Sequence, residues 1–408
     1  MTDDVALAFR EGWGRLVAGL IGWCGDWDLA EECAAEAFAA AVEAWPRDGE
    51  PDRPLAWLTT VARNRARDRI RRRTTQSARH EALAPLLDET SQSPGDAAGD
   101  AADIPDDRLR LIFTCCHPAL PEPARIALTL RTLCGLTNAE IGRAFLVTEA
   151  TMDKRLVRAR AKIKQAAIPY RIPPADVLPE RLDGVLAVVY LLFNEGYAAS
   201  SGEAFLRVDL SAEAIRLARL IHELMPTEAE TAGLLALLLL TDARRRARLR
   251  DGEIVPLPEQ DRSLWNADQT AEAEVLLRAT GGPIGPYAVQ ARIALCHNRS
   301  ADPGQTDWAA IAALYTLLPT TAVTELNRAV AVAMADGPAA GLAIAGPLEP
   351  DLAAYHLFHA TLADLHTRLD HPDQAQECLR RAIDLAPTPA ERRLLRRRLS
   401  AVPPGMGE

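Results

Sequence analysis

Residues 135–163, GLTNAEIGRAFLVTEATMDKRLVRARAKI, constrain the fold of this chain more than any other stretch. Thr137 and Glu140 have the spacing of a capping box, in which a hydroxyl and a carboxylate satisfy backbone donors at the start of a helix. Thr148 offers a second N-cap, after which apolar residues recur at helical spacing. These apolar residues are Met152, Leu156, Ala159 and Ile163. Two short helices joined by a tight turn, the second of them amphipathic, predict a helix-turn-helix.

The second of these helices carries a polar outer face that suits DNA. In a helix-turn-helix the N-terminal part of the recognition helix contacts base edges, so the later cations are expected to lie beside phosphates. The candidate DNA-binding residues here are Thr148, Glu149, Thr151, Lys154, Arg155 and Arg158. A helical hairpin in an ordinary bundle would have the same apolar stripe, so this segment alone leaves that alternative open.

A second cationic helix is expected from Pro54 onward, in the sequence PLAWLTTVARNRARDRIRRR. Each phosphate that a cation neutralises releases counterions, so such a run can supply much of a nucleic-acid affinity. The usual alternative is a solvated helix face, but Asp68 is the only carboxylate among seven arginines, which limits local ion pairing. The candidate DNA-binding residues are Arg63, Asn64, Arg65, Arg69, Arg71, Arg72 and Arg73.

Composition narrows the class of protein and its compartment. The 408 residues allow about two to four domains, and a formal net charge of -10 should confine DNA binding to the two basic segments. Seven scattered cysteines, an odd number, indicate reduced thiols rather than a disulfide framework. The start of the chain has no basic and apolar leader, and the apolar run at 233–240 is too short to span a bilayer. We therefore expect a cytoplasmic protein that does not associate with a membrane.

The chain is expected to be all-α, in four parts. Residues 1–73 form a first helical domain, residues 74–105 a flexible linker, and residues 106–170 the helix-turn-helix domain. Residues 171–408 are successive amphipathic helices, and residues 355–387 match a tetratricopeptide (TPR) helical pair. One pair cannot bury its own faces, so we expect a TPR-like stack of helical hairpins.

No arrangement of residues points to catalysis. The sequence has no Gly-Lys-Ser/Thr phosphate loop, and no nucleophilic triad or carboxylate pair stands out from the solvated charge. Cys115, Cys116 and His117 are not followed by a second ligand pair at a standard zinc spacing. We expect neither enzymatic activity nor a cofactor or metal.

The first and third parts together resemble bacterial sigma factors of the extracytoplasmic-function (ECF) type, two helical DNA-binding domains joined by a flexible linker. AEECAAEAF (residues 30–38) looks like the helix of that family that docks on the β′ clamp helices of RNA polymerase, which implies that Glu32, Glu36 and Phe38 bind polymerase. AWLTTVARNRARDRIRRR (56–73) is similar to the segment that opens and reads the start-proximal promoter element, and TMDKRLVRARAKI (151–163) resembles the upstream recognition helix. The implied partners are core RNA polymerase, through its β′ clamp helices and β flap, and promoter DNA, both double-stranded and melted.

YLLFNEGYAASSGE (residues 190–203) resembles the signature of a sigma subgroup with a TPR-like C-terminal extension. From the residues alone it is a helix ending near Asn194 with Gly196 as a left-handed C-cap, and both a structural turn and a ligand site stay open. The signature residues are Tyr190, Phe193, Asn194, Glu195, Gly196 and Tyr197. The resemblance implies that the extension modulates sigma activity, through an intramolecular or a protein partner.

The predicted function is that of a transcription initiation factor that directs core RNA polymerase to specific promoters. The main alternative is a helix-turn-helix transcriptional regulator with a TPR-like sensor domain, which would need no polymerase-docking helix. A TPR scaffold without DNA function would leave both cationic faces unexplained.

Overall fold

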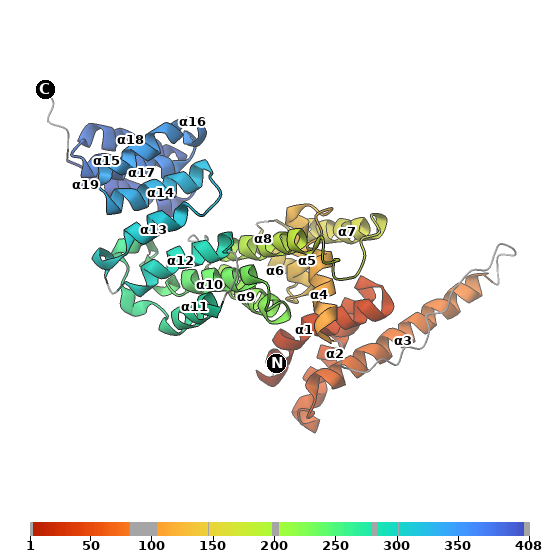
Figure 1. Ribbon diagram of the computed structural model, residues 1–408. Coiled ribbons are helices and arrows are strands. Elements are labelled where there is room, and N and C mark those ends of the chain that lie inside the picture. The colour runs from red at the N-terminus through yellow and green to blue at the C-terminus, as the bar shows by residue number, and fades with distance from the viewer. Residues whose placement is uncertain are drawn as a thin grey trace. The chain divides into compact units, whose positions relative to one another are not determined.

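The computed structural model describes residues 3–81, 104–145, 147–197, 204–279, 284–300 and 302–403. The chain divides into two compact units, Met1–Val189 and Tyr190–Glu408 (Figure 1). Across these described ranges the only sheet is a two-stranded antiparallel ribbon of β1 (Leu249–Arg250) and β2 (Glu253–Ile254), so the expected all-α class is confirmed. None of the helices described here combines the length and hydropathy that crossing a bilayer requires.

The first unit begins with α1 (Asp3–Cys24), α2 (Trp27–Asp48) and α3 (Pro54–Glu81). Asp26 caps α2, since its side chain accepts a hydrogen bond from the Leu29 backbone at 3.0 Å. α3 packs by one stripe of buried residues, Leu58, Ala62 and Ala66, spaced four apart. The helix continues beyond Arg73 to Glu81, because the helical pattern does not stop where the arginines do. The rest of the expected linker, up to residue 103, lies outside the described residues.

The helix-turn-helix is confirmed within four helices, α4 (Ile104–Cys115), α5 (Glu122–Thr132), α6 (Asn138–Ala144) and α7 (Glu149–Gln165). At the start of α6 the Thr137 backbone donates to Glu140 Oε2 at 2.7 Å, and the Glu140 backbone donates to Thr137 Oγ1 at 3.2 Å. Thr148 caps α7 by accepting from the Thr151 backbone. The predicted inner stripe of α7 is the buried one: Met152, Leu156, Ala159 and Ile163.

Helix α8 (Leu178–Tyr197) crosses from one unit into the other. Its first half contacts α4, since Arg181 Nη2 donates to the carbonyl of Phe113 at 2.7 Å. The boundary between the two compact units lies within this helix, after Val189. The helix also continues through Gly196, so the expected left-handed cap at that glycine is wrong.

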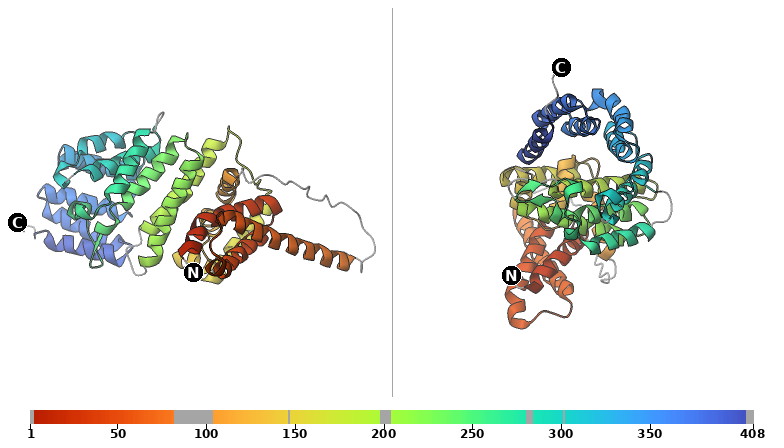
Figure 2. Two further views of the ribbon diagram at one scale, coloured as in Figure 1. Left: turned by 90° about the horizontal axis from the view of Figure 1, so that it is seen from below. Right: turned by 90° about the vertical axis from the view of Figure 1, so that its left-hand side faces the viewer.

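The second unit is a succession of helices, which Figure 2 shows following one another in order. Its α-helices are α9 (Ala204–Leu224), α10 (Ala229–Asp242), α11 (Ala267–Ala279), α12 (Pro286–Arg299), α13 (Trp308–Tyr315), α14 (Ala322–Ala335), α15 (Pro338–Ala345), α16 (Glu349–Leu352), α17 (His356–Arg368), α18 (Pro372–Leu385) and α19 (Pro389–Ala401). Short 3-10 turns connect some of them: η1 (Arg245–Ala247), η2 (Leu257–Glu259), η3 (Arg262–Leu264), η4 (Pro303–Gln305) and η5 (Gly346–Leu348).

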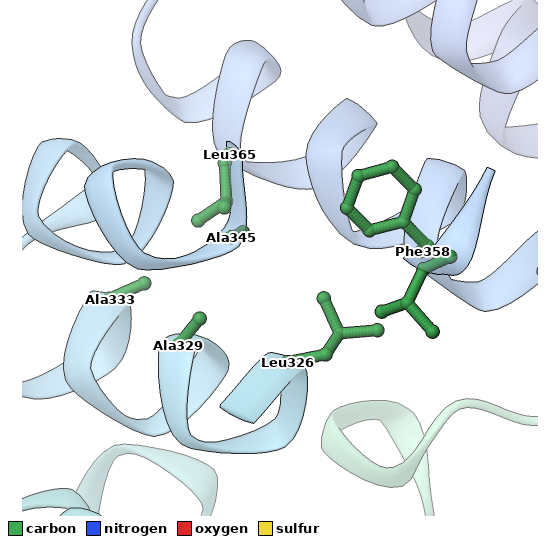
Figure 3. Packing of buried hydrophobic residues seen from close by; sticks show 7 residues of the cluster. Leu326, Ala329, Ala333, Ala345, Phe358 and Leu365 are labelled. Atoms are coloured by element: carbon green, nitrogen blue, oxygen red, sulfur yellow. The ribbon is translucent and has the colours of Figure 1, made fainter. Parts of the chain in front are cut away.

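Neighbouring helices of this unit pack in pairs, α14 with α15 and α17 with α18. Figure 3 shows the core between the pairs, in which Phe358 and Leu365 of α17 join Leu326 of α14. Gly341 lets α15 approach α14 closely, because a Cβ there would lie 2.7 Å from the carbonyl oxygen of Ala329. The expected helical pair at 355–387 is present as α17 and α18, with Pro372 opening the second helix.

Candidate nucleic-acid interface

The outer face of α7 is open to solvent along its first three turns. Thr148, Glu149, Thr151, Lys154 and Arg158 are exposed. Arg155 is half-buried, with its guanidinium 5.9 Å from the centre of the Phe145 ring. All six residues predicted to contact DNA on this helix therefore lie away from the buried stripe, with hydroxyls and a carboxylate at the N-terminal end and cations after them.

The angle between α6 and α7 is supported by a side-chain hydrogen bond. Asn138 Nδ2 donates to Asp153 Oδ1, which joins the first turn of one helix to the second turn of the other. Asp153 is exposed and Asn138 is half-buried, so the bond lies at the edge of the motif rather than in its apolar core. Asp153 thus has a structural role that spacing on α7 alone does not indicate.

The arginines of α3 differ in how they are engaged. Asn64, Arg65, Arg71 and Arg72 are exposed, whereas Arg63 is half-buried. The side chain of Arg73 lies outside what the structure describes. Arg71 and Arg72 thus present cationic groups at the surface of the helix, as a phosphate-binding role requires.

Two α3 arginines pair with carboxylates of α2. Arg65 Nη1 lies 3.0 Å from Glu36 Oε2, and Arg69 Nη2 lies 2.6 Å from Glu36 Oε1. Arg69 also pairs with Glu32, and this hydrogen bond is the main reason that the pKa of Arg69 is raised. Local ion pairing within the run does not account for these contacts, because both carboxylates come from another helix.

Phe38 lies in the core and not on a docking surface. Its side chain is 5% exposed, and its ring centre lies 5.0 Å from that of Phe9 and 6.1 Å from that of Trp13. Helical periodicity explains why Phe38 is buried whereas Glu32 and Glu36 are not. Phe38 falls in phase with the buried Ala34 and Ala41, while the two glutamates lie on another side of the helix. In this conformation Phe38 cannot act as an exposed anchor for polymerase.

The polar residue that sequence reasoning missed is Glu31, which is 5% exposed. Its Oε2 accepts from Arg131 Nε at 2.9 Å, and its Oε1 accepts from Arg160 Nη2 at 2.7 Å and from Thr132 Oγ1 at 3.3 Å. A carboxylate is buried at little net cost only when it is paired and hydrogen-bonded. The available signal was its phase, because Glu31 lies three residues before Ala34 on the apolar stripe of α2.

The signature residues of α8 form a packing junction within the second unit. Phe193 is buried and stacks on Tyr197 with 5.3 Å between ring centres, and Tyr190 packs on Tyr287. The Arg248 guanidinium lies 3.9 Å from the Tyr197 ring centre and donates to the Tyr197 carbonyl. Asn194 is half-buried and Gly196 buried, while the side chain of Glu195 lies outside the described residues.

Three family models match successive parts of the chain. Sigma-70 region 2 matches residues 11–76, which include α2 and most of the arginine helix α3. Sigma-70 region 4 matches residues 110–163, which include the helix-turn-helix. A family of unknown function (DUF6596) matches residues 181–281, from α8 to the end of α11.

Relatives match both the whole chain and its first part. An uncharacterized protein of Rhizobium meliloti is 41% identical over 409 residues, 98% of this chain and 96% of the relative. The ECF RNA polymerase sigma factor SigK of Mycobacterium ulcerans is 30% identical over 136 residues, 32% of this chain and 68% of the relative. The probable RNA polymerase sigma factor RfaY of Xanthomonas campestris is 28% identical over 138 residues, 33% of each chain. No solved structure matches the chain significantly.

Proposed function

Because the chain belongs to the ECF group of sigma-70 family RNA polymerase sigma factors, we propose specific roles for its helices in binding core polymerase and promoter DNA. Sigma factors of this family act in transcription initiation by binding both partners. For this chain we assign the upstream promoter element to α7 and the start-proximal element to α3. The observation that carries this assignment is the outward polar face of α7, which starts at a capped N-terminus above a fully buried stripe.

The division of labour on α7 follows from chemistry. Glu149 and Thr151 carry acceptors and donors that suit base edges, whereas Lys154 and Arg158 are placed for phosphates. On α3 we assign phosphate contacts to Arg71 and Arg72, because both are exposed cationic residues in the last part of the arginine run. The contacts with melted DNA belong to this helix, in keeping with the resemblance of residues 56–73.

We assign polymerase docking to the acidic side of α2, with Glu32 and Glu36 against the β′ clamp helices, and a second contact to region 4 at the β flap. Glu32 is 55% exposed in its side chain and Glu36 is 32% exposed, so both carboxylates are accessible although they are paired with α3. Phe38 supports this docking indirectly, by holding α2 on the core. The protein acts in the cytoplasm and is not an enzyme.

The C-terminal unit modulates transcription initiation by this factor. A single substitution in the packing around the signature residues of α8 should reveal this modulation. Arg248→Ala removes the guanidinium that covers Tyr197, whereas Arg246→Ala, two residues away on the exposed side, removes the same charge without that contact. If the unit is regulatory, the first substitution alters promoter-dependent transcription and the second does not. Equal transcription by both variants under all conditions would remove the support for this role.

Run-off transcription tests the assignment as a whole. Core polymerase is assayed with and without the full chain on the DNA upstream of its own gene, and then with Lys154→Ala/Arg158→Ala against the control Lys162→Ala/Lys164→Ala on the same helix. We expect a discrete transcript that depends on the protein, is lost in the first variant and is kept in the control. Specific DNA binding without polymerase and without any transcript would instead indicate the helix-turn-helix regulator with a TPR-like sensor.

A further inference from the structure

Region 4 covers part of α2, the helix to which we assign polymerase docking. The centre of this contact is the buried Glu31, which accepts from Arg131 of α5 at 2.9 Å and from Arg160 of α7 at 2.7 Å. Arg160 also pairs with Asp28, one turn earlier on α2. The recognition helix therefore uses one of its own cations, on the side away from its DNA face, to hold α2.

The helices around these ion pairs are also closely packed. A Cβ at Gly14 of α1 would lie 2.8 Å from the carbonyl oxygen of Leu133, which follows α5. Gly135 has a φ of 74°, and a Cβ there would lie 2.9 Å from the ring of Phe9. The Tyr170 hydroxyl donates to the carbonyl of Ala18 at 2.9 Å. There is thus no room for a side chain at Gly14 or at Gly135. The contact is therefore closely packed in addition to being held by ion pairs.

The carboxylates of α2 face arginines on both sides. Glu32 and Glu36 pair with α3, and Asp28 and Glu31 pair with region 4. A basic partner that docks on α2 can reach the first pair directly, because these side chains are partly exposed. It cannot reach Glu31 until Arg131 and Arg160 have left, because Glu31 is 5% exposed.

We propose that region 4 and RNA polymerase compete for neighbouring carboxylates of α2, and that the Arg131–Glu31–Arg160 cluster is the latch that holds the free factor closed. The inference rests on the proposed docking role of α2. When polymerase binds, its own basic groups replace the two arginines on Glu31, and region 4 is released for the upstream element. The base-contacting residues of α7 stay exposed in the closed form, so the latch controls access to α2 and not to α7.

Two independent lesions open the latch without altering the acidic face of α2. Arg131→Ala/Arg160→Ala removes the arginines, and its matched control is Lys162→Ala/Lys164→Ala, two exposed cations of α7. Gly14→Ala forces α1 away from Leu133 and leaves every charge in place. Its control is Gly19→Ala on the same helix, where the nearest atom to a new Cβ, Asp107 Oδ2, is 3.9 Å away.

Each full-length variant is measured in two ways. Hydrogen exchange of the free protein reports the closed contact through peptides of α2 and α5, and titration with core polymerase reports docking. Both lesions should raise exchange in these peptides and tighten core binding, while both controls match the parent chain. If the open form is about a tenth of the parent population, apparent affinity should rise roughly tenfold when opening is complete.

The two assays separate failure of the latch from failure of the proposed function. Raised exchange with unchanged or weaker core binding in both lesions would overturn the competition for α2. Unchanged exchange in both lesions would overturn the latch itself. If no chain, the parent included, bound core polymerase, the docking role would fail, and the exchange data would still report whether region 4 is held by Glu31.

Discussion

Replacing Phe38 with Ala tests whether this residue belongs to the core or to a docking surface. The ring is 5% exposed and lies against Phe9 and Trp13. Removing a buried phenylalanine costs about 3–5 kcal/mol, which includes the cavity left behind and the lost ring contacts. Because domains are stable by only about 5–15 kcal/mol, Phe38→Ala should remove a large share of the stability of the first unit.

Urea denaturation followed by tryptophan fluorescence measures this loss. Five of the seven tryptophans lie in the first 57 residues, so the fluorescence reports mainly on α2, which contains Phe38, and on the helices packed around it. With a slope of about 2 kcal/mol per molar urea, a loss of about 4 kcal/mol lowers the midpoint by about 2 M. The control is Glu32→Gln, whose partly exposed carboxylate should change stability by less than about 1 kcal/mol and yet weaken polymerase binding.

The opposite pattern would refute the core assignment. If Phe38→Ala kept the parent midpoint and slope while binding to core polymerase fell, the ring would have to lie at the docking surface in solution. Binding data for this variant therefore need to be normalised to the folded fraction before the two explanations are compared.

Four further predictions concern other parts of the chain. Arg71→Ala/Arg72→Ala should lower promoter affinity evenly across sequences and reduce the slope of log affinity against log salt by about one unit per lost phosphate contact. An unchanged slope would mean that this face of α3 is solvated and does not contact phosphates. Thr148→Ala should cost about 1 kcal/mol in thermal unfolding through loss of the α7 cap, with Thr148→Ser close to the parent. Burial, with the charges of nearby arginines, lowers the pKa of His297 from 6.5 to about 4, so the unfolded chain takes up this proton first. The contribution of His297 to the free energy of unfolding is full above pH 6.5, and up to about 3 kcal/mol of it is lost as the pH falls toward 4. In His297→Gln the free energy of unfolding, measured as a function of pH, should therefore change less over this range. Gly341→Ala should destabilise the second unit by about 1–3 kcal/mol in chemical denaturation, because α15 has no room for a Cβ beside α14.

Much of the helix-turn-helix was predictable from sequence because its determinants are local. The capping box at Thr137 and Glu140 involves residues three apart, and the cap at Thr148 acts on the next turn. The apolar period of α7 selects the buried face, and with it the outward face that carries Lys154 and Arg158. Each of these features depends on backbone geometry that neighbouring residues dictate by themselves.

The roles of the charged and aromatic residues on α2 and α3 depended instead on which helices meet. The arginine count of α3 could not indicate that Arg65 and Arg69 pair with Glu36, which lies about 30 residues away in sequence. The sequence determined on its own that the chain is helical, where its caps lie and which face of α7 is polar, because these are interactions within one or two turns. Only the tertiary structure decided that Phe38 meets the rings of Phe9 and Trp13 and that Glu31 joins α2 to α5 and α7, because these contacts join different helices, and the arginine partners of Glu31 lie 100 and 129 positions away in the chain.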